Sequence, residues 1–410
     1  MTFEDILVYG VSFFGLYTAI FFFLTLYENR KRIGNPRPDG YPSVGVVVPA
    51  FNEETTVGAT IESLLALKYP KDKLHIVVID DGSKDNTLKV AREYEKRGVT
   101  VYTKKNEGKG VALNFALERL DVEFVGALDA DSFVDKWALK RMVGYFKDPK
   151  VMAVTPSMKI FDPKGILQRV QMIEYLFGIF LRKTFAFMGC IHVTPGPFTI
   201  FRKWFFDTYG GYDEHNLTED IEIALRIQSH DYEIENSVDA YVYTVGPNKF
   251  LPLKDQRVRW YKGFMDNVFR YRHLFSLKHG NLGAFILPAA FISVFLVIIA
   301  SAFFIFIYIK NAVRWYLNAQ AVNFDIFRVS FNWDPFFFGF SPIIVISIIG
   351  LVVSITIIAL AKYLSEEKTS LKYSFLIYVF IYGILYAYWW AMSVYYKAFN
   401  RKLVWGSKPL

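Results

Sequence analysis

Four long stretches of the chain carry no charged residue, and one polar segment separates the first stretch from the other three. A helix needs about 20 apolar residues to cross the hydrocarbon core of a bilayer. Each of the four stretches is long enough, so we predict four transmembrane helices. The first lies within residues 1–28 and has its uncharged part at 6–27; the others cover 281–309, 341–361 and 373–396.

The charges next to these stretches place the polar segment on one side of the membrane. Four basic residues follow the first stretch directly: Arg30, Lys31, Arg32 and Arg37. The excess of Lys and Arg in cytoplasmic loops predicts a multi-pass protein of the cell membrane, with residues 35–275 in the cytoplasm and the N-terminus outside. Four crossings would put the C-terminus outside, yet the tail is also basic. Either the tail is an exception to the rule, or segment 310–340 contains a re-entrant piece, or one stretch does not fully cross. The sequence leaves the side of the C-terminus open.

Composition fits this picture and excludes some function classes. Apolar residues make up 53% of the chain and aromatic residues 18%, while the net charge is +8. Much of that charge flanks the first predicted span, and no basic block carries a nucleic-acid-reading motif, so nucleic acid is not expected as a partner. The one cysteine, Cys190, excludes an intrachain disulfide and suits a reducing compartment.

The polar segment begins with strands that alternate with helices. Its apolar, β-branched runs predict strands, and the stretches between them have helical periodicity. This alternation is typical of an α/β domain with a parallel, doubly wound sheet, in which ligands bind at the carboxyl ends of the strands. The predicted strands are 44–51, 74–79, 99–103 and 123–128, and the predicted helices are 54–67, 84–97 and 110–120.

One further helix is expected over residues 164–188. This segment mixes apolar residues with Arg169, Glu174, Arg182 and Lys183, so it is too charged to span a bilayer. It either lies in the membrane interface with its apolar side down or is buried in the domain.

Acidic residues follow two of the predicted strands. Asp129 and Asp131 come after strand 123–128, and Asp80 and Asp81 after strand 74–79. Mg²⁺ and Mn²⁺ prefer hard oxygen ligands and are often shared with substrate phosphates. Asp129 and Asp131 are therefore candidate ligands of a metal that neutralises a departing diphosphate. Each pair also has an ordinary interpretation, because Asp is common in turns and Asp81 or Ser83 could cap the following helix.

A glycine-rich turn at 105–110 precedes the helix at 110–120 and contains Lys109. Glycines let backbone N–H groups face an anion at a helix N-terminus, so Lys109 is a candidate phosphate contact. The spacing is not that of a Walker A loop, and an ordinary turn remains an alternative.

Two more motifs complete the candidate site. Asp220, after Thr218 and Glu219, starts a helix over about 219–229 and is a candidate general base, although acids there also complement the helix dipole. Gln256, Arg259 and Trp260 share one helical face. Arg259 could grip diphosphate oxygens and Trp260 could support a sugar ring; the alternative is a basic juxtamembrane helix.

These motifs, in this order, resemble those of the membrane-embedded inverting glycosyltransferases of family 2, which include cellulose, chitin, hyaluronan and poly-N-acetylglucosamine synthases. The similarity covers about residues 44–262. It implies a GT-A fold, a nucleotide-sugar donor that is expected to be a UDP-sugar, an Mg²⁺ or Mn²⁺ cofactor, and membrane lipids around the helices. The acceptor would be a glycan or a lipid-linked glycan, and an accessory or oligomeric partner is possible.

The resemblance also implies roles for individual residues. Asp220 would be the catalytic base, with Glu219 beside it, and Asp129 and Asp131 would bind the metal. Five positions would lie around the nucleotide: Pro49, Asn52, Glu53, Asp80 and Asp81. Gln256, Arg259 and Trp260 would match the family's Gln-x-x-Arg-Trp motif. The segment Gly196-Pro197-Phe198 looks like the acceptor side.

Two departures keep the product open. Secreting synthases usually have more helices, and residues 243–248 lack the Glu of the family's Glu-x-Pro-Thr. Growth of a polysaccharide is the expected reaction, and single transfer to a lipid acceptor is the alternative. A non-catalytic transporter or scaffold is a weaker alternative. Transporters usually carry ionisable residues inside their spans, and the four predicted spans contain no charged residue.

Overall fold

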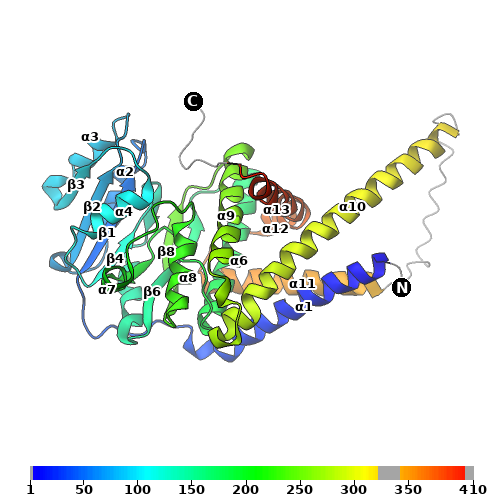
Figure 1. Cartoon of the computed structure of the whole chain (residues 1–410), viewed down its shortest axis with the longest axis horizontal. Helices are drawn as coiled ribbons and strands as arrows, with labels where there is room; N and C mark the ends of the chain where they lie inside the picture. The colour runs from blue at the N-terminus through cyan, green and yellow to red at the C-terminus, as the bar shows by residue number, and fades with distance from the viewer. Residues whose placement is uncertain (1–2, 322–341, 402–410) are drawn as a thin grey trace.

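The computed structural model describes residues 3–321 and 342–401 (Figure 1). It contains one mixed sheet of eight strands in the order β3-β2-β1-β4-β7-β6-β8-β5. Helices cover both faces of the sheet, and long apolar helices extend away from it on one side. The predicted α/β class with attached apolar helices is confirmed.

The first half of the sheet is parallel, as the alternation of strands and helices predicted. Strands β1 and β2 pair in parallel, as do β1 with β4 and β2 with β3. Helices α2 (Val57–Leu65), α3 (Thr87–Arg92) and α4 (Lys109–Leu117) make the crossovers. Every residue of β1 is buried because helices cover both faces. The four strands are β1 (Val44–Ala50), β2 (Leu74–Asp80), β3 (Val99–Thr103) and β4 (Phe124–Ala127).

The second half of the sheet is mixed. Strand β7 pairs antiparallel with both β4 and β6, β6 pairs in parallel with β8, and β5 pairs antiparallel with β8. These strands are β5 (Ser132–Val134), β6 (Val151–Ile160), β7 (Ile200–Arg202) and β8 (Glu233–Thr244). The helices of this half are α5 (Ala138–Met142), α6 (Ile166–Phe187), α7 (Lys203–Tyr209), α8 (Glu219–Ser229) and α9 (Phe250–Arg270).

The helix expected over 84–97 is shorter than predicted. Helix α3 covers Thr87–Arg92 and a separate 3₁₀ turn follows at Glu95–Arg97. The expected cap at Asp81 or Ser83 is wrong, because both side chains are engaged elsewhere. Instead, Asp85 accepts hydrogen bonds from the backbone N–H (3.0 Å) and the hydroxyl of Thr87. Helix α3 therefore begins at Thr87, three residues later than predicted.

Helix α6 lies between the sheet and the apolar helices. It packs against β6 and β8 on one side and against α1 (Phe3–Glu28), α11 (Pro342–Leu364) and α12 (Lys372–Ile377) on the other. Its residues Ile173, Leu176, Ile179 and Phe180 are buried in a core that also contains Ile357 and Ile358 of α11. Helix α6 is thus buried within the protein, as one of the two interpretations holds, and its position relative to a membrane stays a prediction.

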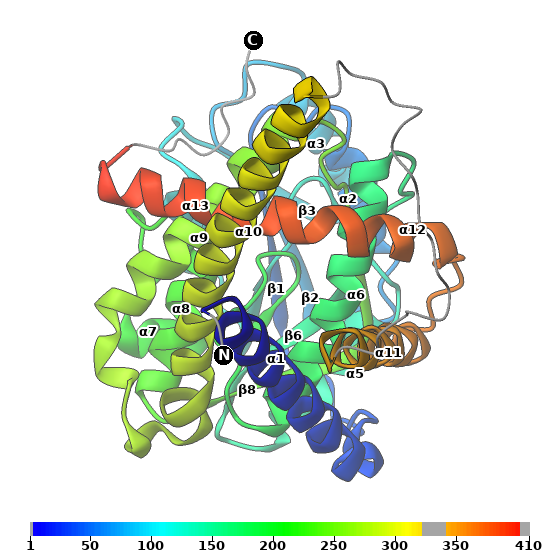
Figure 2. The same cartoon turned by 90° about the vertical axis from the view of Figure 1, so that its right-hand side faces the viewer.

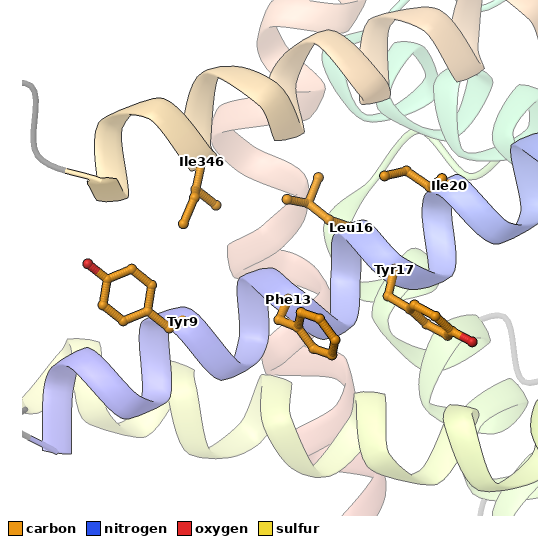
Figure 3. A pocket seen from close by; sticks show the side chains of 6 residues that line it. All are labelled: Tyr9, Phe13, Leu16, Tyr17, Ile20 and Ile346. Carbon is orange, nitrogen blue, oxygen red and sulfur yellow. The ribbon is translucent and has the colours of Figure 1, made fainter.

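Helices occupy all four uncharged stretches. In the part of the chain that the structure describes, four helices are long and apolar enough to cross a membrane: Asp5–Glu28, Leu282–Ala321, Pro342–Leu364 and Lys372–Ala398. The second consists of a π-helical start and α10 (Leu287–Ala321), and the fourth consists of α12, a π-helical turn and α13 (Gly383–Ala398). Between α1 and α11 the side chains of Tyr9, Phe13, Leu16, Tyr17, Ile20 and Ile346 line an apolar pocket (Figure 3).

A buried ion pair joins α6 to α9. The fully buried Arg257 of α9 donates a 2.6 Å hydrogen bond to Glu174 of α6, and its guanidinium lies 4.2 Å from the Trp260 ring centre. A charge buried without its partner is costly, whereas an exposed pair contributes little. The pair therefore ties α9 to α6.

We expect Arg257→Ala to destabilise the fold by about 3–5 kcal/mol, because it removes a fully buried arginine side chain and leaves the mostly buried Glu174 carboxylate without this partner. The matched control is Arg97→Ala, which removes the half-exposed Arg97–Glu62 pair on the surface and should change little. Thermal unfolding of the detergent-solubilised variants measures both. Equal melting temperatures for the two variants would contradict this role of the Arg257–Glu174 pair.

Candidate active site

A buried lysine joins two of the acidic motifs. Lys109 is the first residue of α4, and its Nζ lies 2.9 Å from Oδ1 of Asp129 and 2.9 Å from Oε1 of Glu219. Burial disfavours the ammonium, but the two carboxylates outweigh burial and raise the pKa of Lys109 above its ordinary value. The amine thus stays charged and holds the end of β4 against the start of α8.

The Asp129–Asp131 motif lies directly after β4. The hydroxyl of Thr60, on α2, donates a 2.8 Å hydrogen bond to the carbonyl of Ala130 and fixes the turn. Burial, together with the charges of Asp129 and Glu53, raises the pKa of Asp131 to about 7. Glu53 follows β1, so three carboxylates from two neighbouring strand ends repel one another here.

This donor set fits a hard divalent cation that is shared with a substrate. Within residues 3–321 and 342–401, no group of three or more His, Cys, Asp and Glu side chains is arranged to hold a metal by itself. Asp129 and Asp131 supply carboxylate oxygens, which Mg²⁺ and Mn²⁺ prefer, and leave positions for phosphate oxygens. A cation would also relieve the repulsion that raises the pKa of Asp131.

Asp80 and Asp81 are both buried, and their carboxylates are hydrogen-bonded within the domain. Asp80 accepts from the backbone of Ser83 and from the Thr103 hydroxyl (2.8 Å). Asp81 accepts from Lys104 (2.9 Å) and from the backbone N–H groups of Glu107 (3.2 Å) and Gly108 (2.9 Å). Asp81 thereby fixes the loop that ends in Lys109. Asp81 thereby connects the end of β2 to Lys109, which in turn contacts Asp129 and Glu219.

The residues after β1 link to this loop system as well. Asn52 has a positive φ of 55° and holds the start of the 82–84 turn, because Ser83 accepts from its backbone N–H (3.0 Å) and its side chain accepts from Lys84 (2.8 Å). Pro49 lies inside β1, next to Ile79 of β2, and is buried.

Asp220 lies in the first turn of α8, beside the Lys109 contact. Its backbone carbonyl accepts hydrogen bonds from the N–H (3.1 Å) and the hydroxyl (2.7 Å) of Thr194. Burial and the neighbouring Glu219 raise the pKa of the Asp220 carboxyl to about 7, against the opposing charges of Lys109 and Arg259. A carboxyl with a pKa near 7 is suited to accept a proton at physiological pH.

Close packing holds α9 against the start of α8. A Cβ at Gly263 would lie 2.2 Å from the Thr218 hydroxyl, so only glycine allows this approach. Asn267 donates to the same hydroxyl (2.9 Å), and Arg259 donates to the carbonyl of Leu217 (3.2 Å). These contacts bring the Gln256–Trp260 motif next to Asp220.

The three residues predicted on one face of α9 have different surroundings. Arg259 is partly buried and close enough to Asp220 to affect its charge. Trp260 lies against the Arg257 guanidinium. The Gln256 side chain accepts a 2.6 Å hydrogen bond from Arg257. The structure thus gives Gln256 and Trp260 partners within the chain.

The segment before β7 closes the site near Lys109. A Cβ at Gly196 would lie 2.8 Å from Lys109 Nζ and 3.5 Å from Asp129 Oδ2. Phe198 has a positive φ of 63°, and its backbone N–H donates to the carbonyl of Ala127 at the end of β4. Gly196 therefore leaves the space that the lysine and the aspartate occupy.

The structure brings most of the predicted residues to one edge of the sheet. Glu53, Asp129, Asp131, Lys109, Glu219 and Asp220 form one electrostatic cluster, and Arg259 reaches it from α9. The supporting roles of four further residues were not predicted: Glu174, Arg257, Gly263 and Asn267. Glu174 and Arg257 lie in the segments 164–188 and 256–260. A single sequence carries no signal that two residues 83 positions apart form an ion pair.

Comparisons with known proteins show what this chain is similar to. Residues 45–210 match the model of the family described as glycosyl transferase family 2. A poly-β-1,6-N-acetyl-D-glucosamine synthase from Staphylococcus epidermidis is 29% identical over 364 residues, which cover 87% of this chain and 85% of that protein. Its namesake from Staphylococcus aureus (strain COL) is 31% identical over 275 residues, which cover 64% of this chain and 66% of that protein.

Among solved structures, a mannosyltransferase from Pyrobaculum calidifontis in complex with GDP-mannose and Mn²⁺ has a similar fold. The TM-score is 0.56 at 17% sequence identity, and the alignment covers 96% of this chain and 100% of that one. The similarity extends over the sheet and the apolar helices together.

We expect Gly263→Ala to destabilise the protein by about 1–3 kcal/mol, since a methyl group must push α9 away from Thr218. Gly34→Ala is the matched control, because a Cβ there has no heavy atom within 4 Å. Thermal unfolding in detergent compares the two variants. A Gly263→Ala protein as stable as the control would show that α8 and α9 are not held by this contact.

Proposed function

This chain belongs to glycosyltransferase family 2, and on that premise we propose that it extends a polysaccharide at the membrane by inverting transfer from a nucleotide-sugar. The GT-A fold implied by the sequence agrees with the family match and with the fold of the mannosyltransferase. The observation that carries the proposal is the double ion pair of Lys109, which joins the candidate metal motif to the candidate base motif.

The proposed donor is a UDP-sugar that carries N-acetylglucosamine. The support is the similarity to poly-β-1,6-N-acetyl-D-glucosamine synthases over most of the chain. Asn52, Glu53 and Asp81, at the ends of β1 and β2, are the residues we propose for the nucleotide. In parallel sheets of this kind ligands bind at these strand ends.

The proposed reaction is a single displacement. The Asp220 carboxylate takes the proton of an acceptor hydroxyl, whose oxygen attacks C1 of the donor sugar. The new C1–O bond forms on the face opposite the bond to the diphosphate, which breaks and releases the nucleoside diphosphate. Inversion at C1 follows, because the attacking and leaving groups are on opposite faces.

The other residues of the cluster stabilise charge and position the acceptor. A divalent cation held by Asp129 and Asp131 would neutralise the departing diphosphate, as Mg²⁺ or Mn²⁺ does in such sites. Arg259 supplies a second positive charge beside Asp220. Lys109 and Glu219 keep the two motifs at a fixed separation, and Trp260 offers an apolar face for the acceptor sugar.

Asp220→Asn should reduce sugar transfer by about 10²–10⁴-fold, the usual contribution of a general base, because the amide cannot take the proton. Nucleotide binding should persist, since the amide keeps the size of the side chain. Radiolabelled sugar incorporation and calorimetric UDP titration measure the two effects. The conservative Asp207→Asn, on the exposed surface of α7, is the control. Full activity of Asp220→Asn would refute this assignment.

The transfer rate should rise with pH through about 7 and then level off. A base with its pKa raised to about 7 is protonated and inactive below that pH, and ionised above it. Glu219 raises this pKa, so Glu219→Gln should move the rising limb towards acidic pH. Initial rates from pH 5.5 to 8.5 test both statements. A flat profile in the wild-type enzyme contradicts a base at Asp220.

Product length separates polymer synthesis from single transfer. Purified enzyme supplied with donor and membrane lipid should produce a ladder of oligosaccharides on gel electrophoresis. The product should stay in the aqueous phase and grow with time. A single organic-soluble product would instead identify a lipid acceptor and replace the polysaccharide proposal.

A further inference from the structure

The last apolar helix has an unusual direction. In Figure 1, α1 and α11 run lengthwise away from the sheet, while α12 and α13 are seen nearly end-on beside the domain. In the turned view of Figure 2, α12 and α13 run across the picture and α11 is seen end-on. The two views agree that the 372–398 helix lies crosswise to α11.

Both ends of this helix are tied to the same domain. The loop before it is held by the buried Lys159 of β6, which donates to the carbonyl of Ser365 (2.6 Å) and pairs with Glu367 (3.3 Å). At the other end, Lys397 forms an ion pair with Asp266 of α9. A 27-residue helix is about 40 Å long, more than the hydrocarbon core needs. A helix that crossed the bilayer would separate these two ends.

One face of the helix packs on the domain. Trp390 stacks on Tyr261 of α9 with ring centres 4.4 Å apart, and the buried Ser393 donates to the carbonyl of Val258 (3.4 Å). Trp389 is fully buried, and the Arg257 guanidinium lies 5.7 Å from its ring centre. Helix α13 thus supports the turn of α9 that carries Arg259 and Trp260.

The opposite face is apolar and exposed along its whole length. Its residues recur at spacings of three and four, so they form a single stripe. Most are large: Tyr373, Leu376, Phe380, Ile384, Tyr388, Ala391, Tyr395 and Phe399. A one-sided stripe of this kind, with tyrosines, is typical of a helix that lies in the headgroup region of a membrane.

We propose that α12–α13 does not cross the membrane but lies flat on the bilayer surface nearest the catalytic domain, with its stripe at the headgroup–acyl boundary. The stripe is continuous with the membrane-spanning part, because α12 packs against α6, which also contacts α1 and α11, and α13 packs against α10. The occupant of the stripe is therefore lipid.

The proposal reduces the crossings to three, made by α1, α10 and α11. The C-terminus then lies on the same side as the catalytic domain. Lys397 and Arg401 join the basic residues at 30–32 on that side, which is the arrangement that the positive-inside rule favours. With three spans, the basic tail lies in the cytoplasm and no longer conflicts with the positive-inside rule.

Labelling of single cysteines in sealed vesicles tests the topology. Asn400→Cys, introduced with Cys190→Ala, should react with a membrane-impermeant maleimide from the same side as Glu93→Cys in the catalytic domain. Asn318→Cys, at the far end of α10, should react only from the opposite side. Labelling of Asn400→Cys from the same side as Asn318→Cys would overturn the proposal.

The depth of the 372–398 helix in the bilayer provides a second test, which does not depend on where the C-terminal tail lies. A polarity-sensitive fluorophore on Phe380→Cys should be quenched more strongly by spin labels near the lipid headgroups than by labels near the chain ends. The same fluorophore on Val352→Cys, in the middle of α11, should be quenched more strongly by the spin labels near the chain ends. The proposal fails if Phe380→Cys behaves like Val352→Cys, or if neither label quenches it.

Discussion

The buried ammonium of Lys109 is the interaction on which the site depends. It contacts carboxylates that follow β4 and start α8, and its own position is set by the loop that Asp81 fixes after β2. The positive charge of the lysine thereby allows several acidic groups, which would otherwise repel one another, to share a small volume. Burial, together with the remaining repulsion between carboxylates, raises the pKa values of Asp131 and Asp220.

A second constraint comes from the membrane side. Helix α9 carries Arg259 and Trp260, and it is held from three directions by Thr218 of the α8 start, Glu174 of α6 and the aromatic side chains of α13. Helices α6 and α13 both contact the apolar helices. The α9 side of the site is thus built on elements that contact the apolar helices, which suits the proposed extension of a polysaccharide at the membrane.

Sequence patterns predicted the parallel half of the sheet because β-branched runs and helical periodicity are local signals. The strand-end position of Asp129 and Asp131 followed from them. The mixed half was not predicted, since β7 has three residues and pairs with strands distant in the chain. Nor were the Arg257–Glu174 pair and the close approach of Gly263 to Thr218, which depend on tertiary contacts. The direction of the 372–398 helix also escaped, because length and composition are the same for a helix that crosses and one that lies flat.

The central claim is that these motifs form one metal-assisted sugar-transfer site. The most direct measurement is nucleoside-diphosphate release by the purified protein in lipid, across a panel of UDP- and GDP-sugars, with Mg²⁺, with Mn²⁺ and with chelator. The account predicts release from one UDP-sugar, with N-acetylglucosamine as the expected sugar, and loss of release on chelation. Release that persists in chelator would contradict the metal role of Asp129 and Asp131, and silence with every donor and lipid would contradict the transferase site itself.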